Sequence, residues 1–138
     1  MPEVRTSTIL MVDDEDMVRL LCVRILTEAG YRASEARNGD EALELLSAGC
    51  PDLLITDSSM PVLSGFGLIL EARSRYPSLP ILRISGSYGS PGLRDQIPPD
   101  IMTLHKPFGG EELLAAVGRL LEVGQVRELK TQTRSLRA

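Results

Sequence analysis

Residues 8–16 read Thr-Ile-Leu-Met-Val-Asp-Asp-Glu-Asp, and this stretch decides the fold. The apolar run at 8–12 does not alternate with polar positions, which is typical of a strand buried on both faces of a parallel sheet. The run stops at four acidic residues, and a helical pattern begins directly after them. A buried strand that passes through a polar turn into a helix predicts the first unit of an α/β domain.

The same alternation of strands and helices continues along the chain. Further strands are expected at 31–36, 53–56, 81–84 and 101–104, and helices at 18–29, 38–49, 65–75 and 111–123. The core-facing positions predicted for the first helix are Val18, Leu21, Cys22, Ile25, Leu26 and Ala29. Gly30 stands where a helix ends in a left-handed residue. Right-handed crossovers at this spacing predict a three-layer α/β domain with a parallel sheet covered on both faces.

Two segments depart from this pattern. Six of the fifteen residues between 86 and 100 are glycine or proline, so the fourth crossover is expected to hold only a short or irregular helix. Residues 124–138 form a basic tail, with four basic residues and one acidic residue. We predict that this tail is flexible, and a frayed extension of the preceding helix is the alternative.

Composition excludes several classes of protein. A chain of 138 residues with 43% apolar side chains suits one domain, and its net charge of −4 argues against direct binding to nucleic acid. No apolar run approaches the ~18 residues that span a bilayer, and no secretory signal is visible, so we expect no membrane contact and a cytoplasmic protein. The two cysteines, Cys22 and Cys50, are expected to be reduced thiols, because two are too few for a disulfide framework or a zinc site.

The chemically reactive residues stand at the ends of the predicted strands. Asp13 and Asp14 follow the first strand, Asp57 the third, Ser85 the fourth and Lys106 the fifth. In an open parallel sheet, ligands bind beyond the carboxyl ends of the strands, so these side chains should converge. Three close carboxylates repel one another unless they share a cation, and oxygen ligands suit Mg²⁺. A metal, an ammonium group and a hydroxyl around one carboxylate predict a site that stabilises a phosphoryl group.

Four segments together resemble the receiver domains of two-component response regulators, the CheY-like superfamily. They are residues 9–16, Asp57-Ser-Ser-Met-Pro61 with Ser64-Gly65, Ile84-Ser85-Gly86 and Lys106-Pro-Phe108. The resemblance covers residues 7–123 and is strongest to receivers associated with hybrid sensor histidine kinases. It implies a flavodoxin-like (βα)5 sandwich whose parallel strands are ordered 2-1-3-4-5.

The resemblance also implies a function. Asp57 would accept a phosphoryl group from the phosphohistidine of a sensor histidine kinase or a phosphotransfer protein, and the reaction would need Mg²⁺. By position, Asp14 would contact the metal directly and Asp13 mainly through water. Asp57 would supply a carboxylate oxygen, and Ser59 its backbone carbonyl.

The remaining residues of the motif would bind the phosphoryl group. Ser85 would hydrogen-bond one phosphoryl oxygen and Lys106 would pair with another, and Pro107 would follow a cis peptide bond. Such a domain catalyses its own phosphorylation and dephosphorylation without being an ordinary enzyme. Thr103 stands where many members carry an aromatic residue that moves on phosphorylation, so the way in which this chain transmits the change is left open.

Several alternatives stay open or are disfavoured. Only fifteen residues follow Val123, so we expect signalling by contact with a downstream protein of unknown identity. A receiver excised from a hybrid kinase is an alternative, as is an interaction module that is never phosphorylated, and a weak homodimer is left open. A phosphohydrolase of the haloacid-dehalogenase type would carry a second aspartate where Ser59 stands, and no glycine-rich phosphate loop follows the first strand.

Overall fold

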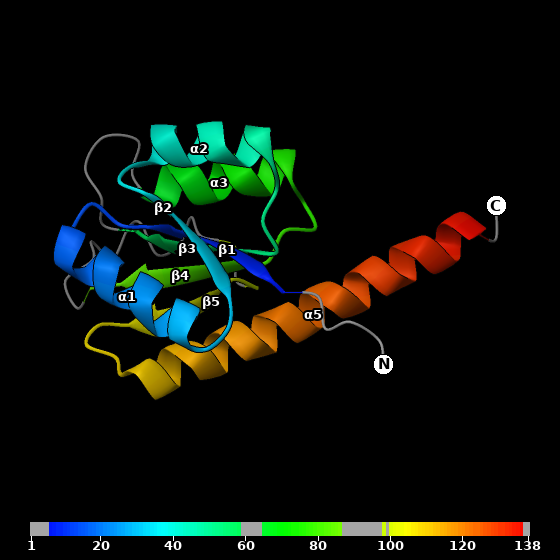
Figure 1. Cartoon of the computed structure of the whole chain (residues 1–138). Coiled ribbons are helices and arrows are strands. Elements are labelled where there is room, and N and C mark those ends of the chain that lie inside the picture. The colour runs from blue at the N-terminus through cyan, green and yellow to red at the C-terminus, as the bar shows by residue number, and fades with distance from the viewer. Residues whose placement is uncertain (1–5, 59–64, 87–97, 99, 137–138) are drawn as a thin grey trace.

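The computed structural model describes residues 6–58, 65–86, 98 and 100–136 (Figure 1). Their elements, in chain order, are β1 (Thr8–Val12), α1 (Asp16–Glu28), β2 (Arg32–Ala36), α2 (Gly39–Ala48), β3 (Leu53–Asp57), α3 (Gly65–Arg75), β4 (Ile81–Ser85), β5 (Met102–His105) and α5 (Gly110–Leu136). The helix that we predicted in the fourth crossover falls on residues 87–97, which lie outside the described residues.

The strands form one parallel sheet in the order β2-β1-β3-β4-β5, which confirms the predicted topology. Helices α2 and α3 cover one face of the sheet, and α1 and α5 cover the other (Figure 1). The chain leaves β1 toward β2 and later returns to the other side of β1 as β3. This change of direction places a crevice between the carboxyl ends of β1 and β3, where open α/β sheets bind ligands.

Strand β1 is buried on both faces, as its uninterrupted apolar run predicts. Ile9 and Met11 pack into the core beneath α1 and α5, whereas Leu10 and Val12 pack into the core beneath α2 and α3. All four side chains are at most 2% exposed. Because successive strand residues point to opposite faces, only a strand between two helical layers needs apolar residues at every position.

Helix α1 turns most of the predicted face to the core: Cys22 and Leu26 are buried and Val18 and Ile25 pack against the core, but Leu21 and Ala29 are exposed. Its buried residues are Arg19, Cys22 and Leu26, and Leu21, which we predicted to be core-facing, is 59% exposed. Consecutive helical residues are about 100° apart, so the apolar positions of α1 form a band wider than the face that can touch the sheet. The docking angle of the helix selects the part of that band that is buried. The chain leaves α1 through Gly30, whose φ of 101° confirms the predicted left-handed turn.

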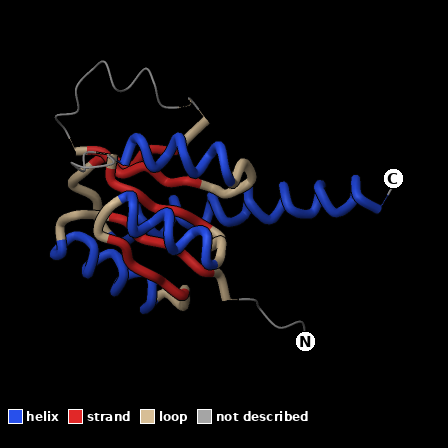
Figure 2. The backbone as a smooth tube through the Cα atoms, turned by 90° about the horizontal axis from the view of Figure 1, so that it is seen from above, coloured by secondary structure: helices blue, strands red, loops and turns tan. Residues whose placement is uncertain are grey.

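Helix α5 continues beyond the end that we predicted for it. It runs to Leu136, so the described backbone of the tail is helical, which was the alternative to a flexible tail. The extension leaves the body of the domain at one end of the sheet (Figures 1 and 2). A helix already formed on the core can add further turns without a new nucleation step, and no proline follows residue 123 to stop it. A domain end at residue 123 stays a prediction.

Candidate functional site

The residues singled out in the sequence stand at one edge of the sheet. Asp13 directly follows β1, Asp57 is the last residue of β3, Ser85 is the last residue of β4, and Lys106 directly follows β5. The strands are parallel, so these four positions share the edge formed by their carboxyl ends. Asp13 and Asp57 belong to the neighbouring strands at the change of direction, where a ligand crevice is expected.

Three carboxylates come together at this edge. Asp13, Asp14 and Asp57 each offer an oxygen, and these oxygens lie within 4.8 Å of one another. Asp57 is 1% exposed and Asp13 is fully buried, whereas Asp14 is exposed. Two buried and mutually repelling carboxylates are costly in a fold unless positive charge offsets them.

Lys106 supplies part of that positive charge. Its Nζ donates a hydrogen bond of 2.9 Å to Asp57 Oδ2 and lies 3.7 Å from Asp13 Oδ2 and 3.8 Å from Glu15 Oε1. Partial burial works to lower the pKa of Lys106. The hydrogen bond to Asp57 and the negative charges of Asp57, Asp13 and Glu15 outweigh this effect, so the pKa of Lys106 lies above its usual value. The ammonium group is therefore fully charged at neutral pH. The predicted cis bond between Lys106 and Pro107 is confirmed.

Asp13 is an acid of this group whose pKa is clearly raised. Burial raises its pKa from 3.8 to about 6, and the negative charges of Asp57 and Asp14 add to the rise. A hydrogen bond of 2.9 Å from the Glu15 backbone N–H to Asp13 Oδ1 and the charge of Lys106 act in the opposite direction. In the absence of a cation, Asp13 is thus mostly ionised at neutral pH but takes up a proton near pH 6 instead of near 3.8.

The hydroxyl of Ser85 points to its own backbone neighbour. Ser85 Oγ donates to the Gly86 carbonyl at 3.1 Å and accepts from Arg83 Nη2 at 3.4 Å. Arg83 and Thr103 are register partners on β4 and β5, so the position without the expected aromatic lies beside an arginine. Ser59, predicted to offer a backbone carbonyl to the metal, lies outside the described residues.

The carboxylate group has the donor set of a divalent cation site. Asp13 Oδ2 is buried, and it has no hydrogen-bond partner among the residues that the structure describes. An oxygen in this situation is normally satisfied by an ion or an ordered water. Carboxylate oxygens alone, with nitrogen and sulfur ligands absent from the cluster, match the preference of Mg²⁺. The residues present therefore fit the metal that the sequence predicts.

Arg19 is a residue of this region that sequence reasoning missed. Its guanidinium donates to the backbone carbonyl of Asp13 at 2.9 Å, and its side chain is 8% exposed. The signal in the sequence was an arginine three positions before Cys22 and seven before Leu26, in line with two core residues of the same helix. Helical periodicity treats such a residue as polar surface, so only the docked helix identifies it.

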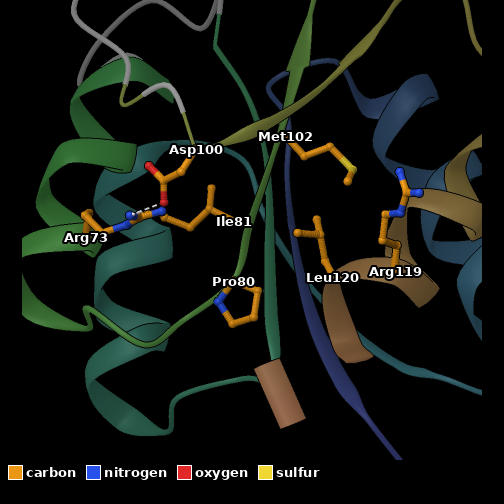
Figure 3. Close-up of a pocket in the computed structure, with 7 residues that line it drawn as sticks. All are labelled: Arg73, Pro80, Ile81, Asp100, Met102, Arg119 and Leu120. Atoms are coloured by element: carbon orange, nitrogen blue, oxygen red, sulfur yellow. Dashed lines mark hydrogen bonds and ion pairs between the residues drawn. The ribbon is translucent and has the colours of Figure 1, made fainter. Parts of the chain in front are cut away.

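A surface pocket lies at the opposite end of the strands (Figure 3). Its lining residues are Arg73, Pro80, Ile81, Asp100, Met102, Arg119 and Leu120. Ile81 and Met102 begin β4 and β5, so this pocket lies beside the amino ends of the strands and away from the carboxylates. Arg73 and Asp100 form an ion pair of 2.8 Å there, and the guanidinium is thereby matched by a carboxylate of this chain.

Fold and site together define a class of protein: a doubly wound α/β domain with a lysine-paired aspartate in an acidic cluster at the carboxyl edge of its sheet. Residues 9–118 match the response regulator receiver domain family. The chain belongs to this family of two-component signalling domains. Among the residues that the structure describes, none of the helices has the length and apolar character needed to cross a membrane.

Relatives with known names include two types of signalling protein. The chain is 36% identical over 121 residues to the sensor kinase CckA of Brucella abortus, which covers 85% of this chain and 13% of CckA. It is 37% identical over 123 residues to the response regulator MprA of Mycobacterium ulcerans, which covers 82% of this chain and 49% of MprA. The chain thus spans half or less of these relatives.

A solved structure shows the same fold over nearly its whole length. The chemotaxis protein CheY4 of Vibrio cholerae superposes with a TM-score of 0.75 at 31% identity. The superposition covers 84% of this chain and 99% of CheY4.

Proposed function

We propose that this chain accepts a phosphoryl group on Asp57 in a Mg²⁺-dependent reaction, as one step of a phosphorelay. One observation carries the proposal: Lys106 Nζ lies 2.9 Å from Oδ2 of the buried Asp57, inside a cluster of three carboxylates. A lysine that only neutralised surface charge would pair with the exposed Glu15, yet it makes its shortest contact with the buried acid. An ammonium group that contacts one carboxylate can also bind the oxygens of a phosphoryl group that is transferred to that carboxylate.

The carboxylates of Asp13, Asp14 and Asp57 would hold the metal, and the backbone carbonyl of Ser59 is proposed as a further ligand. When bound, Mg²⁺ offsets the negative charge of the acids and of an incoming phosphoryl group. The buried oxygen of Asp13 that lacks a hydrogen bond supports this assignment. Asp14 is exposed, which suits a ligand that a cation arriving from solvent meets first.

The proposed chemistry is an in-line displacement at phosphorus. A carboxylate oxygen of Asp57 attacks, a P–O bond forms, and the P–N bond of a phosphohistidine breaks. The imidazole leaves with the electron pair of that bond and takes up a proton. Lys106 pairs with a phosphoryl oxygen, and Ser85 turns its hydroxyl from the Gly86 carbonyl to another. Attack of water on phosphorus later releases inorganic phosphate and restores the Asp57 carboxylate.

An apolar face beside the site fits a protein as the phosphoryl donor. Met17, Leu20 and Leu21 on α1 are 83%, 53% and 59% exposed, and they stand three and four positions apart on one helix face. This face starts four residues after Asp13. We propose that the protein that brings a phosphohistidine to Asp57 covers this face, because an apolar helix face is a common docking surface.

Phosphoryl transfer is tested by intact-mass analysis after incubation with Mg²⁺ and acetyl phosphate. We expect the parent protein to gain one phosphoryl group, and the chelator EDTA to abolish the gain. Asp57→Ala should show no gain, whereas Asp40→Ala, which removes an exposed aspartate of α2, should be labelled like the parent. Equal labelling of the Asp57 variant would refute the proposal. If neither acetyl phosphate nor a phosphorylated histidine kinase labels the parent, the chain is an interaction module without phosphorylation.

The donor face is tested with a phosphorylated histidine phosphotransfer protein. Leu21→Ser should slow transfer from this protein far more than it slows labelling by acetyl phosphate, because the small donor needs no docking surface. Leu45→Ser is the matched control, since Leu45 is a leucine of α2 with 37% exposure. Equal slowing by the two variants would show that α1 is not part of the docking surface.

We propose that the phosphorylated chain signals by contact with a downstream protein.

A further inference from the structure

Arg19 occupies a position in α1 that packing alone would give to an apolar residue. It is 7% exposed and lines up with Cys22 and Leu26 on the buried side of the helix. Taking a charged group out of water is costly, and an aliphatic side chain would fill the same place without that cost. The contacts of the guanidinium must therefore account for its presence.

All three nitrogen atoms of the guanidinium donate hydrogen bonds. Nη1 donates to the backbone carbonyl of Asp13 at 2.9 Å, Nη2 to Asp16 Oδ1 at 2.6 Å and Nε to Glu35 Oε1 at 3.0 Å. Two of these acceptors are carboxylates that remain partly in solvent, with side-chain exposures of 70% for Asp16 and 39% for Glu35. The third is the carbonyl of a fully buried member of the acidic cluster.

With this contact, three of the four polar groups of Asp13 take part in hydrogen bonds. Its backbone N–H donates to the Ala36 carbonyl at 3.2 Å, its carbonyl accepts from Arg19, and its Oδ1 accepts from the Glu15 N–H at 2.9 Å. Oδ2 is left without a hydrogen bond among the described residues, 3.7 Å from Lys106 Nζ. The peptide between Asp13 and Asp14 therefore cannot rotate without breaking the bond to Arg19.

We infer that Arg19 is a positioning residue for the cation site: it locks the Asp13–Asp14 peptide so that the carboxylates of both residues face Asp57. The inference rests on the proposed function, because it concerns the same acidic cluster. Groups that orient metal ligands without touching the metal typically affect metal affinity 10- to 100-fold.

Charge alone predicts the opposite effect, which makes the inference testable. Arg19 is a cation near a cation site, and its removal would also free the carboxylates of Asp16 and Glu35 from their partner. Both effects would tighten the binding of a divalent cation by simple electrostatics. If Arg19 works through the geometry of Asp13, its replacement must weaken binding instead.

The experiment measures the dissociation constant of Mn²⁺ for the full chain, by electron paramagnetic resonance of the free ion. Mn²⁺ accepts the same oxygen ligands as Mg²⁺. Arg19→Lys keeps the charge but loses the planar fork of donors, and Arg19→Gln loses the charge as well. Arg24→Lys is the matched control, because Arg24 lies on the same helix, is 77% exposed and pairs with Glu28. Far-UV circular dichroism checks that each variant is folded at the temperature used.

We expect both Arg19 variants to bind Mn²⁺ at least about tenfold more weakly, and Arg24→Lys to bind as the parent does. Glu35→Gln should have a much smaller effect, since it spares the bond to the Asp13 carbonyl. Unchanged or tighter binding in the Arg19 variants would overturn the inference and leave the proposed function intact. An equal loss of Mn²⁺ affinity in Glu35→Gln would also overturn it, because the ion pair between α1 and β2 would then account for the effect. If the parent itself binds no Mn²⁺, both the cation site and the inference are refuted.

Discussion

Replacing Asp13 with asparagine should stabilise the protein in a buffer that contains EDTA. Burial is the main reason that the pKa of Asp13 rises from 3.8 to about 6. A tenfold change in proton affinity is worth about 1.4 kcal/mol, so ionising Asp13 in the folded state costs about 3 kcal/mol. Asparagine keeps an oxygen that accepts the Glu15 N–H, and it removes the buried charge. We expect the free energy of unfolding of Asp13→Asn to exceed that of the parent by about 1–3 kcal/mol at pH 7.5.

The same cause sets the pH dependence. The folded-state pKa of Asp13 lies above the unfolded value, so the folded protein binds more protons between pH 3.8 and about 6. The destabilisation by Asp13 is therefore fully present above about pH 6 and disappears as the pH falls toward 4. The stability advantage of Asp13→Asn should shrink accordingly between pH 7.5 and pH 5. Saturating Mg²⁺ should shrink or reverse it as well, because a cation bound only to the folded parent stabilises it.

Urea unfolding followed by far-UV circular dichroism measures these differences, with EDTA or Mg²⁺ present. Glu44→Gln is the control, since it removes an exposed negative charge from α2 and should change stability by less than about 0.5 kcal/mol. The reasoning fails if Asp13→Asn is no more stable than the parent in EDTA at pH 7.5. It also fails if the advantage is the same at pH 5 as at pH 7.5.

Two further predictions concern helix packing and the reactivity of a buried thiol. An added Cβ at Gly124 of α5 would lie 2.9 Å from Cγ of Pro80, whereas one at Gly118 would meet no atom within 4 Å. Gly118→Ala should therefore stabilise the helix by about 0.5–1 kcal/mol. Gly124→Ala should be less stable than Gly118→Ala by about 1–3 kcal/mol. Urea unfolding measures the difference, and equal midpoints for the two variants would contradict the close approach of Gly124 to Pro80. Burial raises the pKa of the Cys22 thiol to about 11, and the side chain is 1% exposed, whereas Cys50 is exposed. Iodoacetamide at pH 8 should thus label Cys50 alone in the native protein and both thiols in urea. Peptide mapping measures the labelling, and a rate at native Cys22 similar to that at Cys50 would refute this prediction.

The central strands of the sheet could be predicted from local patterns because their sequences carry a clear signal. Residues 8–12 and 53–56 are largely apolar runs that are followed directly by aspartate, and such runs are typical of strands between two helical layers. Right-handed crossovers then predict a parallel sheet, whereas the particular strand order 2-1-3-4-5 was implied by the resemblance to receiver domains. The helical extension beyond residue 123 was harder to predict, because its residues tolerate both a helix and an open chain, and continuity with a docked helix favours the first.

The amino-acid sequence by itself determined which residues stand at the carboxyl edge of the sheet, because strand ends and the turns after them are local features. Tertiary structure alone decided how those residues meet. Lys106 pairs most closely with Asp57, Arg19 turns inward to the carbonyl of Asp13, and Leu21 remains exposed. The raised pKa of Asp13 also depends on the fold, because it comes mainly from burial and in part from Asp57 on another strand. Burial and electrostatic interaction depend on distances between segments far apart in the chain, and these distances exist only once the layers have packed.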